Sequence, residues 1–288
     1  MNTSVSSKKR SLSLLAGLSL LLMLQGCGLT LANLITPSSG YDDIATITYG
    51  DSDRQSIDIF APADAPIKKP LLIFFYGGAW EEGKKEDYRF VAQAFTKQGY
   101  RVAIPDYRIY PDVIFPAFVE DGAAAVAALD QQFPDAPLVL IGHSAGAHIA
   151  ALLTLNEKYL NAQGVNSDRI AAWVGWSGPY DFLPLTSDTL KEIFVEDLRQ
   201  ASQPINFVNA NVPPTLLIHG LDDTRVKPQN SKNLAARLEQ HGVRVTTHYY
   251  EGVSHVGTVG SLVAFLSSWS DTLPDTLGFL EQLKANPE

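Results

Sequence analysis

The spacing of apolar residues along the chain predicts eight strands, with helices between most of them. Two short segments, 44–49 and 56–60, alternate apolar and polar residues around the turn Asp51-Ser52-Asp53, and this pattern predicts a hairpin. Continuous or nearly continuous apolar runs follow, as expected for strands covered on both faces of a sheet. These further predicted strands are 71–75, 101–104, 138–141, 171–176 and 214–218, and segment 244–250 is predicted as the last strand.

Apolar residues at helical spacing separate most of these strands and fill the C-terminal region. The predicted helices lie around residues 90–95, 118–133, 147–153, 229–241, 258–270 and 274–285. Strands that alternate with helices predict an α/β fold, with a mostly parallel eight-stranded sheet and helices on both faces. Segment 177–212 is a longer insertion and predicts a small cap. We see no repeat and no internal linker, so residues 44–288 are expected to form one domain.

One strand leads directly into a motif with chemical meaning. Residues 142–146 read Gly-His-Ser-Ala-Gly after four apolar residues, and a helical composition follows. This fits G-x-S-x-G, in which a serine sits on a sharp strand-to-helix turn. The glycines leave room for strand and helix to approach, and the helix N-terminus points its free N–H groups at Ser144. The alternative is a serine in an ordinary turn between a strand and a helix.

A nucleophilic serine needs a base, and the base needs an orienting acid. We predict His255 as the base, because it follows the last strand in a short loop from which it can reach back over the sheet. The other histidines are His143, His148, His219, His241 and His248. The acid is expected at Asp223, from the pattern His-Gly-x-x-Asp-x-x-Val, with Asp222 as the alternative. The chain order Ser144, Asp223, His255 is the order found in α/β-hydrolases.

An oxyanion formed at Ser144 needs at least two N–H donors. We expect one from Ala145, directly after the serine. The others are assigned to Gly78 and Ala79, in the loop after the strand 71–75, where two glycines allow close approach of the backbone. The alternative is that Gly77 and Gly78 simply end the strand in a turn.

These motifs resemble the α/β-hydrolase superfamily over roughly residues 44–270. Within it the chain is similar to hormone-sensitive-lipase-like carboxylesterases and kynurenine formamidase-like enzymes. The matching segments are 76–80 against the family's His-Gly-Gly-x-Trp, 106–108, 142–148 and 177–181. The resemblance implies an α/β-hydrolase fold and serine hydrolase chemistry. Tyr76 departs from it, because the family has a histidine there that braces the oxyanion loop.

The N-terminus predicts export and lipidation. Lys8-Lys9-Arg10 precede an almost wholly apolar stretch, 12–24, that is short for a membrane span, as in a secretory signal. Leu24-Gln25-Gly26-Cys27 resembles a bacterial lipobox, which implies a signal peptide over 1–26, a lipidated Cys27 and a tether over 27–43. We therefore expect a lipoprotein anchored to a membrane of the bacterial cell envelope. An uncleaved anchor or an ordinary signal cut elsewhere are the alternatives.

Composition narrows the possible partners. The 288 residues carry a formal net charge of −9 and a single cysteine, so no internal disulfide is possible. We see no clustered Lys and Arg of the kind that bind nucleic acid, no metal-ligand cluster and no dinucleotide motif. We therefore expect a small-molecule substrate, with no cofactor, no metal and no nucleic acid.

Together these features predict a serine hydrolase that cleaves carboxylic esters through an acyl-enzyme. An arylformamidase is the close alternative, a prolyl-oligopeptidase-like peptidase is less favoured, and a non-catalytic surface binding scaffold is the alternative from another class. Aromatic residues near the strand ends, with only a short insertion as lid, favour small acyl groups. The aromatic residues considered for this pocket are Trp80, Trp173, Trp176 and Phe182.

Overall fold

The computed structural model describes residues 33, 36, 41–63 and 66–285. In this part of the chain the strands are β1 (Tyr41–Thr48), β2 (Ser56–Pro62), β3 (Lys68–Phe75), β4 (Tyr100–Pro105), β5 (Leu138–His143), β6 (Ile170–Trp176), β7 (Thr215–Gly220) and β8 (Val245–Tyr250). The α-helices are α2 (Arg89–Thr96), α3 (Ala117–Gln132), α4 (Ala145–Leu155), α5 (Lys158–Ala162), α6 (Asp188–Ile193), α7 (Gln229–Gln240), α8 (Gly257–Gly260) and α9 (Thr272–Ala285). Short 3-10 helices are η1 (Lys85–Tyr88), η2 (Ser167–Arg169), η3 (Glu196–Leu198), η4 (Pro204–Phe207) and η5 (Ala264–Trp269).

The eight strands form one sheet in the order β1-β2-β4-β3-β5-β6-β7-β8. β1 pairs antiparallel with β2, and β2 pairs antiparallel with β4. Every pairing from β4 to β8 across the sheet is parallel. The predicted fold class, a mostly parallel eight-stranded sheet with an N-terminal hairpin, is therefore confirmed.

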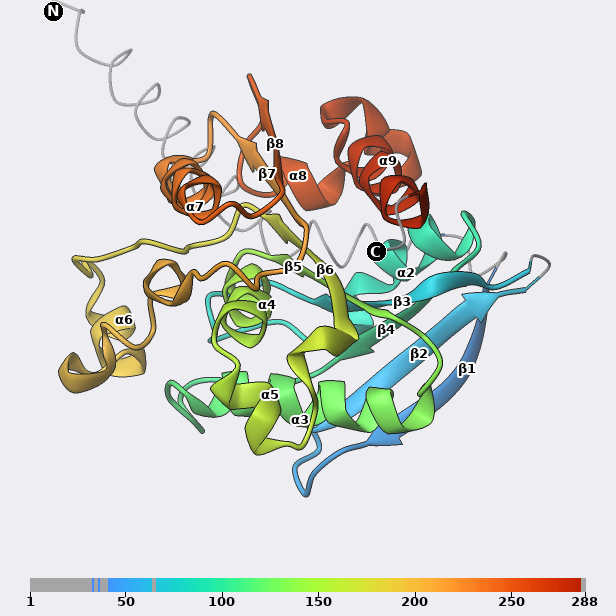
Figure 1. The fold of residues 1–288 in the computed structure, drawn as a ribbon, viewed down its shortest axis with the longest axis horizontal. Helices are drawn as coiled ribbons and strands as arrows, with labels where there is room; N and C mark the ends of the chain where they lie inside the picture. Colours follow the sequence, from blue (N-terminus) through green and yellow to red (C-terminus); the bar gives the residue numbers. More distant parts are fainter. Residues whose placement is uncertain (1–32, 34–35, 37–40, 64–65, 286–288) are drawn as a thin grey trace, which may run out of the picture.

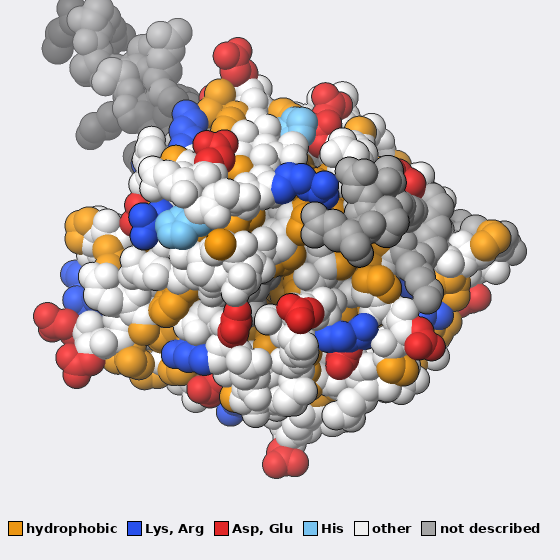
Figure 2. All heavy atoms as spheres, in the orientation of Figure 1, with side chains coloured by type: hydrophobic (Ala, Val, Ile, Leu, Met, Phe, Trp, Pro, Cys, Tyr) orange, Lys and Arg blue, Asp and Glu red, His pale blue; other side chains and the backbone are white. Residues whose placement is uncertain are grey.

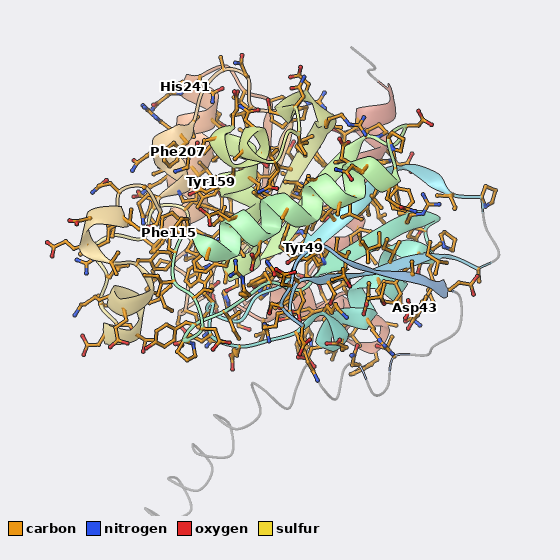
Figure 3. All side chains as sticks on the ribbon, turned by 90° about the horizontal axis from the view of Figure 1, so that it is seen from below. Asp43, Tyr49, Phe115, Tyr159, Phe207 and His241 are labelled. Atoms are coloured by element: carbon orange, nitrogen blue, oxygen red, sulfur yellow. The ribbon has the colours of Figure 1, made fainter. Side chains whose placement is uncertain are left out.

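Helices cover both faces of this sheet (Figure 1). On one face α3, α4 and α5 pack together, with α4 against β5 and β6. Figure 3 shows α3 crossing in front of the strands on this side. On the other face α2 and α9 lie close together. The ring of Phe95 in α2 stacks on Trp176 of β6 with centroids 6.3 Å apart, and Tyr100 hydrogen-bonds Glu281 of α9.

The register aligns the carboxyl ends of the central strands. Gly142 of β5 lies beside Phe75 of β3 and beside Gly175 of β6. In parallel sheets of this kind, ligands bind beyond the carboxyl ends of the strands. The loops that follow β3, β5, β7 and β8, with the first residue of α4, hold every predicted catalytic and oxyanion residue, so the fold gathers them beyond the carboxyl ends of the strands.

Trp173 and Trp176, considered for the pocket along with Trp80 and Phe182, pack on opposite faces of the sheet. Trp173 and Trp176 are completely buried and lie three positions apart on β6, so they face opposite sides of the sheet. Trp173 packs edge-on against Tyr180, and Trp176 packs against Phe74 and Phe95. Their rings fill the two layers between sheet and helices.

The helix predicted over 258–270 is wrong. The chain forms the single turn α8, then passes through Val263 in an extended conformation with ψ 123°, and ends in the 3-10 helix η5. Segment 177–212 contains α6, η3 and η4 and is otherwise irregular. β1 begins at Tyr41, three residues before the expected start of the domain. The expected signal peptide, Cys27 and most of the tether lie outside the described residues.

Candidate active site

The turn between β5 and α4 holds Ser144 in an unusual backbone conformation. Its φ is +55° and ψ is −122°, a region that non-glycine residues occupy at a cost in free energy. The backbone N–H of Ser144 donates to the carbonyl of Trp176 at 2.9 Å, which extends the β5–β6 pairing by one residue. The side chain then projects from the carboxyl edge of the sheet, as the elbow motif predicts.

Two glycines make this turn possible. A Cβ added at Gly142 would lie 2.5 Å from the backbone nitrogen of Ala147. A Cβ added at Gly146 would lie 2.1 Å from the carbonyl oxygen of Phe75. Both distances are far below van der Waals contact with backbone atoms that cannot rotate away. The strand and the helix therefore approach at a distance that only glycine permits at these two positions.

The structure brings Ser144, His255 and Asp223 together in one hydrogen-bonded chain. Nε2 of His255 lies 2.8 Å from Oγ of Ser144, and Nδ1 of His255 lies 2.7 Å from Oδ2 of Asp223. An ionised carboxylate can only accept, so Nδ1 carries the proton of the neutral ring. Nε2 is then free to accept the proton of the serine hydroxyl.

Asp223 is buried and its carboxylate is fully hydrogen-bonded. Oδ1 accepts from the backbone N–H groups of Arg225 and Val226, both at 2.9 Å. Oδ2 lies 3.2 Å from Nε2 of His219, in addition to its bond with His255. Burial acts to raise the pKa of Asp223, but the hydrogen bonds from His219, His255 and the backbone outweigh it and hold that pKa well below its usual range. The group therefore stays ionised.

Asp222, the alternative acid, lies in a different environment. Its side chain is exposed, and its backbone N–H donates to the carbonyl of Val253 at 3.1 Å. His219 of β7 fixes the loop that carries both carboxylates. Its Nδ1 bonds Oγ of Ser231 at 2.7 Å, and its Nε2 bonds the carbonyl of Val226 at 2.9 Å. The geometry thus places Asp223, not Asp222, against His255.

His143 has a role that the sequence did not indicate. Its Nε2 lies 3.1 Å from the carbonyl oxygen of His255, so it donates to that oxygen, and the two rings are 5.0 Å apart. Burial lowers the pKa of His143 to about 3, and the nearby His255 adds to the effect. His143 is therefore a neutral donor at ordinary pH. It holds the backbone of His255 from the position directly before Ser144.

The loop after β3 lies against Ser144. A Cβ added at Gly77 would lie 3.0 Å from Cβ of Ser144. The backbone has positive φ at Gly78 (145°), Ala79 (52°) and Trp80 (62°). Among the described residues, no acceptor bonds the backbone N–H groups of Gly78, Ala79 or Ala145. These are the three groups that the sequence assigned to an oxyanion hole.

An aromatic cluster fills the space behind this loop. Trp80 stacks near Phe182 with centroids 6.1 Å apart and meets Phe194 edge-on at 4.8 Å. Both phenylalanines come from segment 177–212. His148 lies among these rings, 5.1 Å from Trp80, and its Nε2 donates to the carbonyl of Ser202 at 2.7 Å. Burial lowers the pKa of His148 to about 4, so this ring is also neutral.

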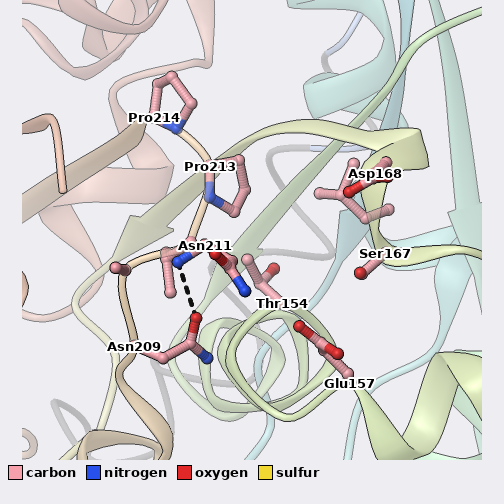
Figure 4. Close-up of a pocket in the computed structure, with 11 residues that line it drawn as sticks. Thr154, Glu157, Ser167, Asp168, Asn209, Asn211, Pro213 and Pro214 are labelled. Atoms are coloured by element: carbon pink, nitrogen blue, oxygen red, sulfur yellow. Dashed lines mark hydrogen bonds between the residues drawn. The ribbon is translucent and has the colours of Figure 1, made fainter.

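A polar depression elsewhere on the surface contains none of the predicted site residues. It is lined by Thr154, Glu157, Ser167, Asp168, Ile170 and the loop 209–214 (Figure 4). Asn209 closes one side by accepting from the backbone N–H of Asn211 at 2.8 Å. Thr154 lies near the C-terminal end of α4 and Ile170 at the start of β6, so the depression lies at the opposite edge of the sheet from Ser144.

The surface carries both signs of charge. Figure 2 shows acidic and basic side chains interspersed on the face that it presents, with small groups of apolar side chains between them. Within residues 41–63 and 66–285, no three His, Cys, Asp or Glu side chains gather closely enough to hold a metal ion. No helix in this part of the chain is both long enough and apolar enough to cross a membrane.

Comparison with curated proteins finds esterases and a formamidase. The probable isoprenylcysteine alpha-carbonyl methylesterase of Arabidopsis thaliana is 31% identical over 240 residues, which cover 73% of this chain and 50% of the relative. The kynurenine formamidase of Salmo salar is 25% identical over 229 residues, which cover 76% of this chain and 77% of the relative. The chain thus spans about half the length of the methylesterase and about three quarters of the formamidase.

Solved structures agree with the fold. Esterase B from Lactobacillus rhamnosis superposes with a TM-score of 0.75 and 19% identity, covering 95% of each chain. The family model described as BD-FAE matches residues 57–238, which run from β2 through Ser144 and Asp223 to α7. This match takes in more than half of the sequence. The chain therefore belongs to the BD-FAE family of α/β-hydrolases.

Proposed function

We propose that this protein is a serine hydrolase that cleaves carboxylic esters. The observation that carries the proposal is the chain of hydrogen bonds from Ser144 through His255 to Asp223, at 2.8 and 2.7 Å. This geometry lies within the range in which a base can take the proton of a nucleophile. The esterase names among the relatives and membership of an α/β-hydrolase family support the same reaction.

In the proposed first half-reaction, Oγ of Ser144 attacks the carbonyl carbon of the ester while Nε2 of His255 takes its proton. The imidazolium that forms is stabilised by the buried carboxylate of Asp223. The negative charge on the former carbonyl oxygen is met by the N–H groups of Ala145, Gly78 and Ala79. His255 then gives its proton to the departing alcohol, and the acyl group remains on Ser144.

In the second half-reaction, water takes the place of the alcohol. His255 accepts a proton from the water as the oxygen attacks the acyl carbon. The tetrahedral intermediate uses the same N–H groups and collapses with return of the proton to Ser144. The carboxylic acid leaves, and the reaction requires only these side chains and backbone donors.

The aromatic cluster supports a preference for short acyl groups. Trp80 directly follows the proposed oxyanion residues, and its ring is almost completely buried between Phe182, Phe194 and His148. Side chains occupy the space that a long acyl chain would need in this direction. Each further methylene adds roughly 0.8 kcal/mol of binding only where it can be buried. We therefore propose that acetyl and butyryl esters are cleaved with higher kcat/KM than decanoyl esters.

An arylformamidase is the second candidate. The observation that favours it is that the kynurenine formamidase relative matches over 77% of its own length, a larger share than the methylesterase relative. The reaction would use the same groups, because a formamide carbonyl is attacked in the same way and an arylamine departs. The formyl group is also the smallest acyl group, so it suits a pocket narrowed by the aromatic cluster around Trp80.

Hydrolysis of p-nitrophenyl esters of increasing chain length, measured beside N-formylkynurenine, tests both candidates. We expect Ser144→Ala and His255→Ala each to reduce turnover by about a thousandfold or more with the fold intact by circular dichroism. A Ser144→Ala variant that keeps wild-type turnover would refute the mechanism. A rate that still rises at C12 would refute the small acyl pocket. Wild-type protein that hydrolyses neither class would favour a non-catalytic binding scaffold.

We also propose that the protein is exported and anchored to a bacterial envelope membrane through a lipid on Cys27. The basic residues, apolar stretch and lipobox-like sequence before Cys27 support this. Its small-molecule substrate would then be met outside the cytoplasm.

A further inference from the structure

The loop from Gly77 to Gly83 keeps a backbone conformation that it would not adopt alone. Ala79 and Trp80 both have φ near +60°, where the Cβ of an L-residue crowds its own backbone. A Cβ at Gly78 would lie 2.0 Å from the carbonyl oxygen of Glu82, so the loop is also tightly folded on itself. Strained residues of this kind persist only where surrounding structure holds them. The residues that hold this loop therefore matter for the N–H donors that it carries.

Arg54 contacts the loop from an unexpected place in the chain. It lies in the turn between β1 and β2, at the far end of the N-terminal hairpin, and its side chain is 26% exposed. Nη2 of Arg54 donates to the carbonyl of Gly83 at 2.6 Å and to the hydroxyl of Tyr76 at 3.1 Å. Tyr76 directly precedes the loop, and Gly83 is its last residue. One guanidinium nitrogen thus joins both ends.

The guanidinium is itself held in place. Nε of Arg54 donates to the carbonyl of Tyr107 at 2.9 Å, and Nη2 lies 3.5 Å from the carboxylate of Asp106. The hydroxyl of Tyr76 donates to the same carboxylate. Asp106 therefore fixes both partners of the contact between Arg54 and Tyr76. The planar fork of arginine suits several acceptors at fixed angles, which a lysine ammonium on a flexible stem does not.

Two further tyrosines hydrogen-bond the backbone at the start of the loop. The hydroxyl of Tyr107 donates to the carbonyl of Tyr76 at 2.7 Å, and that of Tyr88 donates to the carbonyl of Gly77 at 3.2 Å. The ring of Tyr76 stacks between them, with centroids 4.7 Å from Tyr107 and 5.3 Å from Tyr88. These contacts fix the first residues of the loop. At its far end, the ring of Tyr76 lies against Gly83, and Arg54 is the residue among these that hydrogen-bonds the Gly83 carbonyl.

We propose that Arg54 is a positioning residue that clamps the oxyanion loop closed across Tyr76 and Gly83. The inference rests on the proposed ester hydrolysis, because the loop matters through the N–H groups of Gly78 and Ala79. Tyr76 stands where the resembling enzymes have a histidine, and its longer side chain carries a hydroxyl to the hairpin turn. In the resembling enzymes the histidine braces the loop from the position directly before it. Here Arg54 supplies that support from the turn between β1 and β2.

The test compares Arg54→Met with the wild type on p-nitrophenyl acetate. Donors displaced from the oxyanion lower the rate of the chemical step more than they weaken substrate binding. We expect kcat to fall by about 10- to 100-fold while KM changes by less than about threefold. Inhibition by a trifluoromethyl ketone, which forms a tetrahedral adduct with the serine, should weaken by a similar factor. Arg54→Lys should show a smaller loss.

Arg169 offers a matched control. Its side chain is 28% exposed, forms an ion pair with Asp130 at 2.5 Å, and donates to the carbonyls of Phe133 and Ala136. It thus holds a loop in the way that Arg54 does, but at the opposite edge of the sheet. Arg169→Met should lower the melting temperature by an amount similar to Arg54→Met and leave kcat unchanged.

Hydrogen exchange gives a readout that does not depend on activity. Amides of residues 77–83 should exchange about tenfold faster in Arg54→Met than in wild type or Arg169→Met. If Arg54→Met does not fold, Tyr76→Phe, which keeps the stacked ring but removes the hydroxyl, should show the same loss of kcat and faster exchange. Unchanged kcat and exchange in these variants, or equal losses of kcat in Arg54→Met and Arg169→Met, would overturn the clamp. A wild-type protein without ester hydrolysis would refute the proposed function instead, and exchange would still decide the clamp.

Discussion

The two adjacent carboxylates after β7 show how strongly position decides the role of a residue. Asp223 is buried and accepts hydrogen bonds from two backbone N–H groups and two histidines, whereas Asp222 is exposed. We expect Asp223→Asn to lower kcat by about 10³- to 10⁴-fold, because an amide no longer stabilises the imidazolium of His255. Asp222→Asn should stay within about twofold of wild type. Steady-state kinetics on p-nitrophenyl acetate measures both, and a larger loss in Asp222→Asn would reverse the assignment.

Two buried histidines make stability depend on pH. The pKa values of His143 and His148 are lowered by burial to about 3 and about 4, against 6.5 for an unperturbed ring. Between these values the unfolded chain binds protons that the folded protein refuses, so the free energy of unfolding falls as pH falls from about 6.5. Each histidine contributes at most about 1.4 kcal/mol per pH unit. We expect the free energy of unfolding, measured with urea between pH 5 and 6.5, to change less with pH in His148→Gln than in the wild type. An equal pH dependence in the two proteins would contradict this.

At this scale the sequence predicted residues that follow a local pattern and missed those that act over long distances. Ser144 lies in a five-residue motif, and His255 and Asp223 follow strands in a known order, so all three could be placed from the sequence. Arg54 lies in an ordinary polar turn, and nothing nearby in the sequence points to a loop some 25 residues away. His143 precedes Ser144 in the same turn, where its side chain is expected to point away from the serine, and the sequence gives no sign of its hydrogen bond to the carbonyl of His255.

The turn from β5 to α4 leaves no room for a Cβ atom at its two glycines. We expect Gly146→Ala to destabilise the fold by about 3 kcal/mol or more and to abolish activity, because its Cβ would meet the carbonyl of Phe75 at 2.1 Å. Gly278→Ala is the control: it lies exposed in α9, and no described atom lies within 4 Å of the added Cβ. That variant should be neutral or up to about 1 kcal/mol more stable. Thermal unfolding of both variants measures the contrast, and similar losses of stability in both would contradict the steric reason.

The strands were easier to predict than the helix after His255. The interior strands β3, β5, β6 and β7 are mostly apolar and buried, and the N-terminal hairpin alternates apolar and polar residues, so both patterns predict strands directly. Residues 258–270 also have apolar spacing, but Gly260 and the serines of this segment have low helix propensity. The chain instead turns at Val263 and leaves Phe265 and Trp269 exposed, at 61% and 49%. Tertiary packing at α8 and α9 decided this segment, and spacing alone could not show it.

At the scale of the whole molecule, the proposed lipid anchor predicts where the protein is found. The mature chain should begin at a diacylated, N-acylated Cys27 and sediment with membranes, because more than one acyl chain gives stable anchoring. Cys27→Ser should release the protein or leave an uncleaved precursor. Fractionation and mass spectrometry of the N-terminus measure this. An unmodified N-terminus at another residue would rule out the anchor, and Ser144→Ala should fractionate as the wild type does.

The order of strands also sets an order in which activity and structure are lost. Ser144 follows β5, an interior strand whose residues are all buried, whereas His255 follows β8, an edge strand that is half-exposed along its whole length. Edge strands open locally at a lower free energy than the interior. Mild warming should therefore displace His255 while Ser144 stays packed in its turn. The protein is therefore expected to lose activity at a lower temperature than the one at which it unfolds. On cooling it should regain activity without refolding.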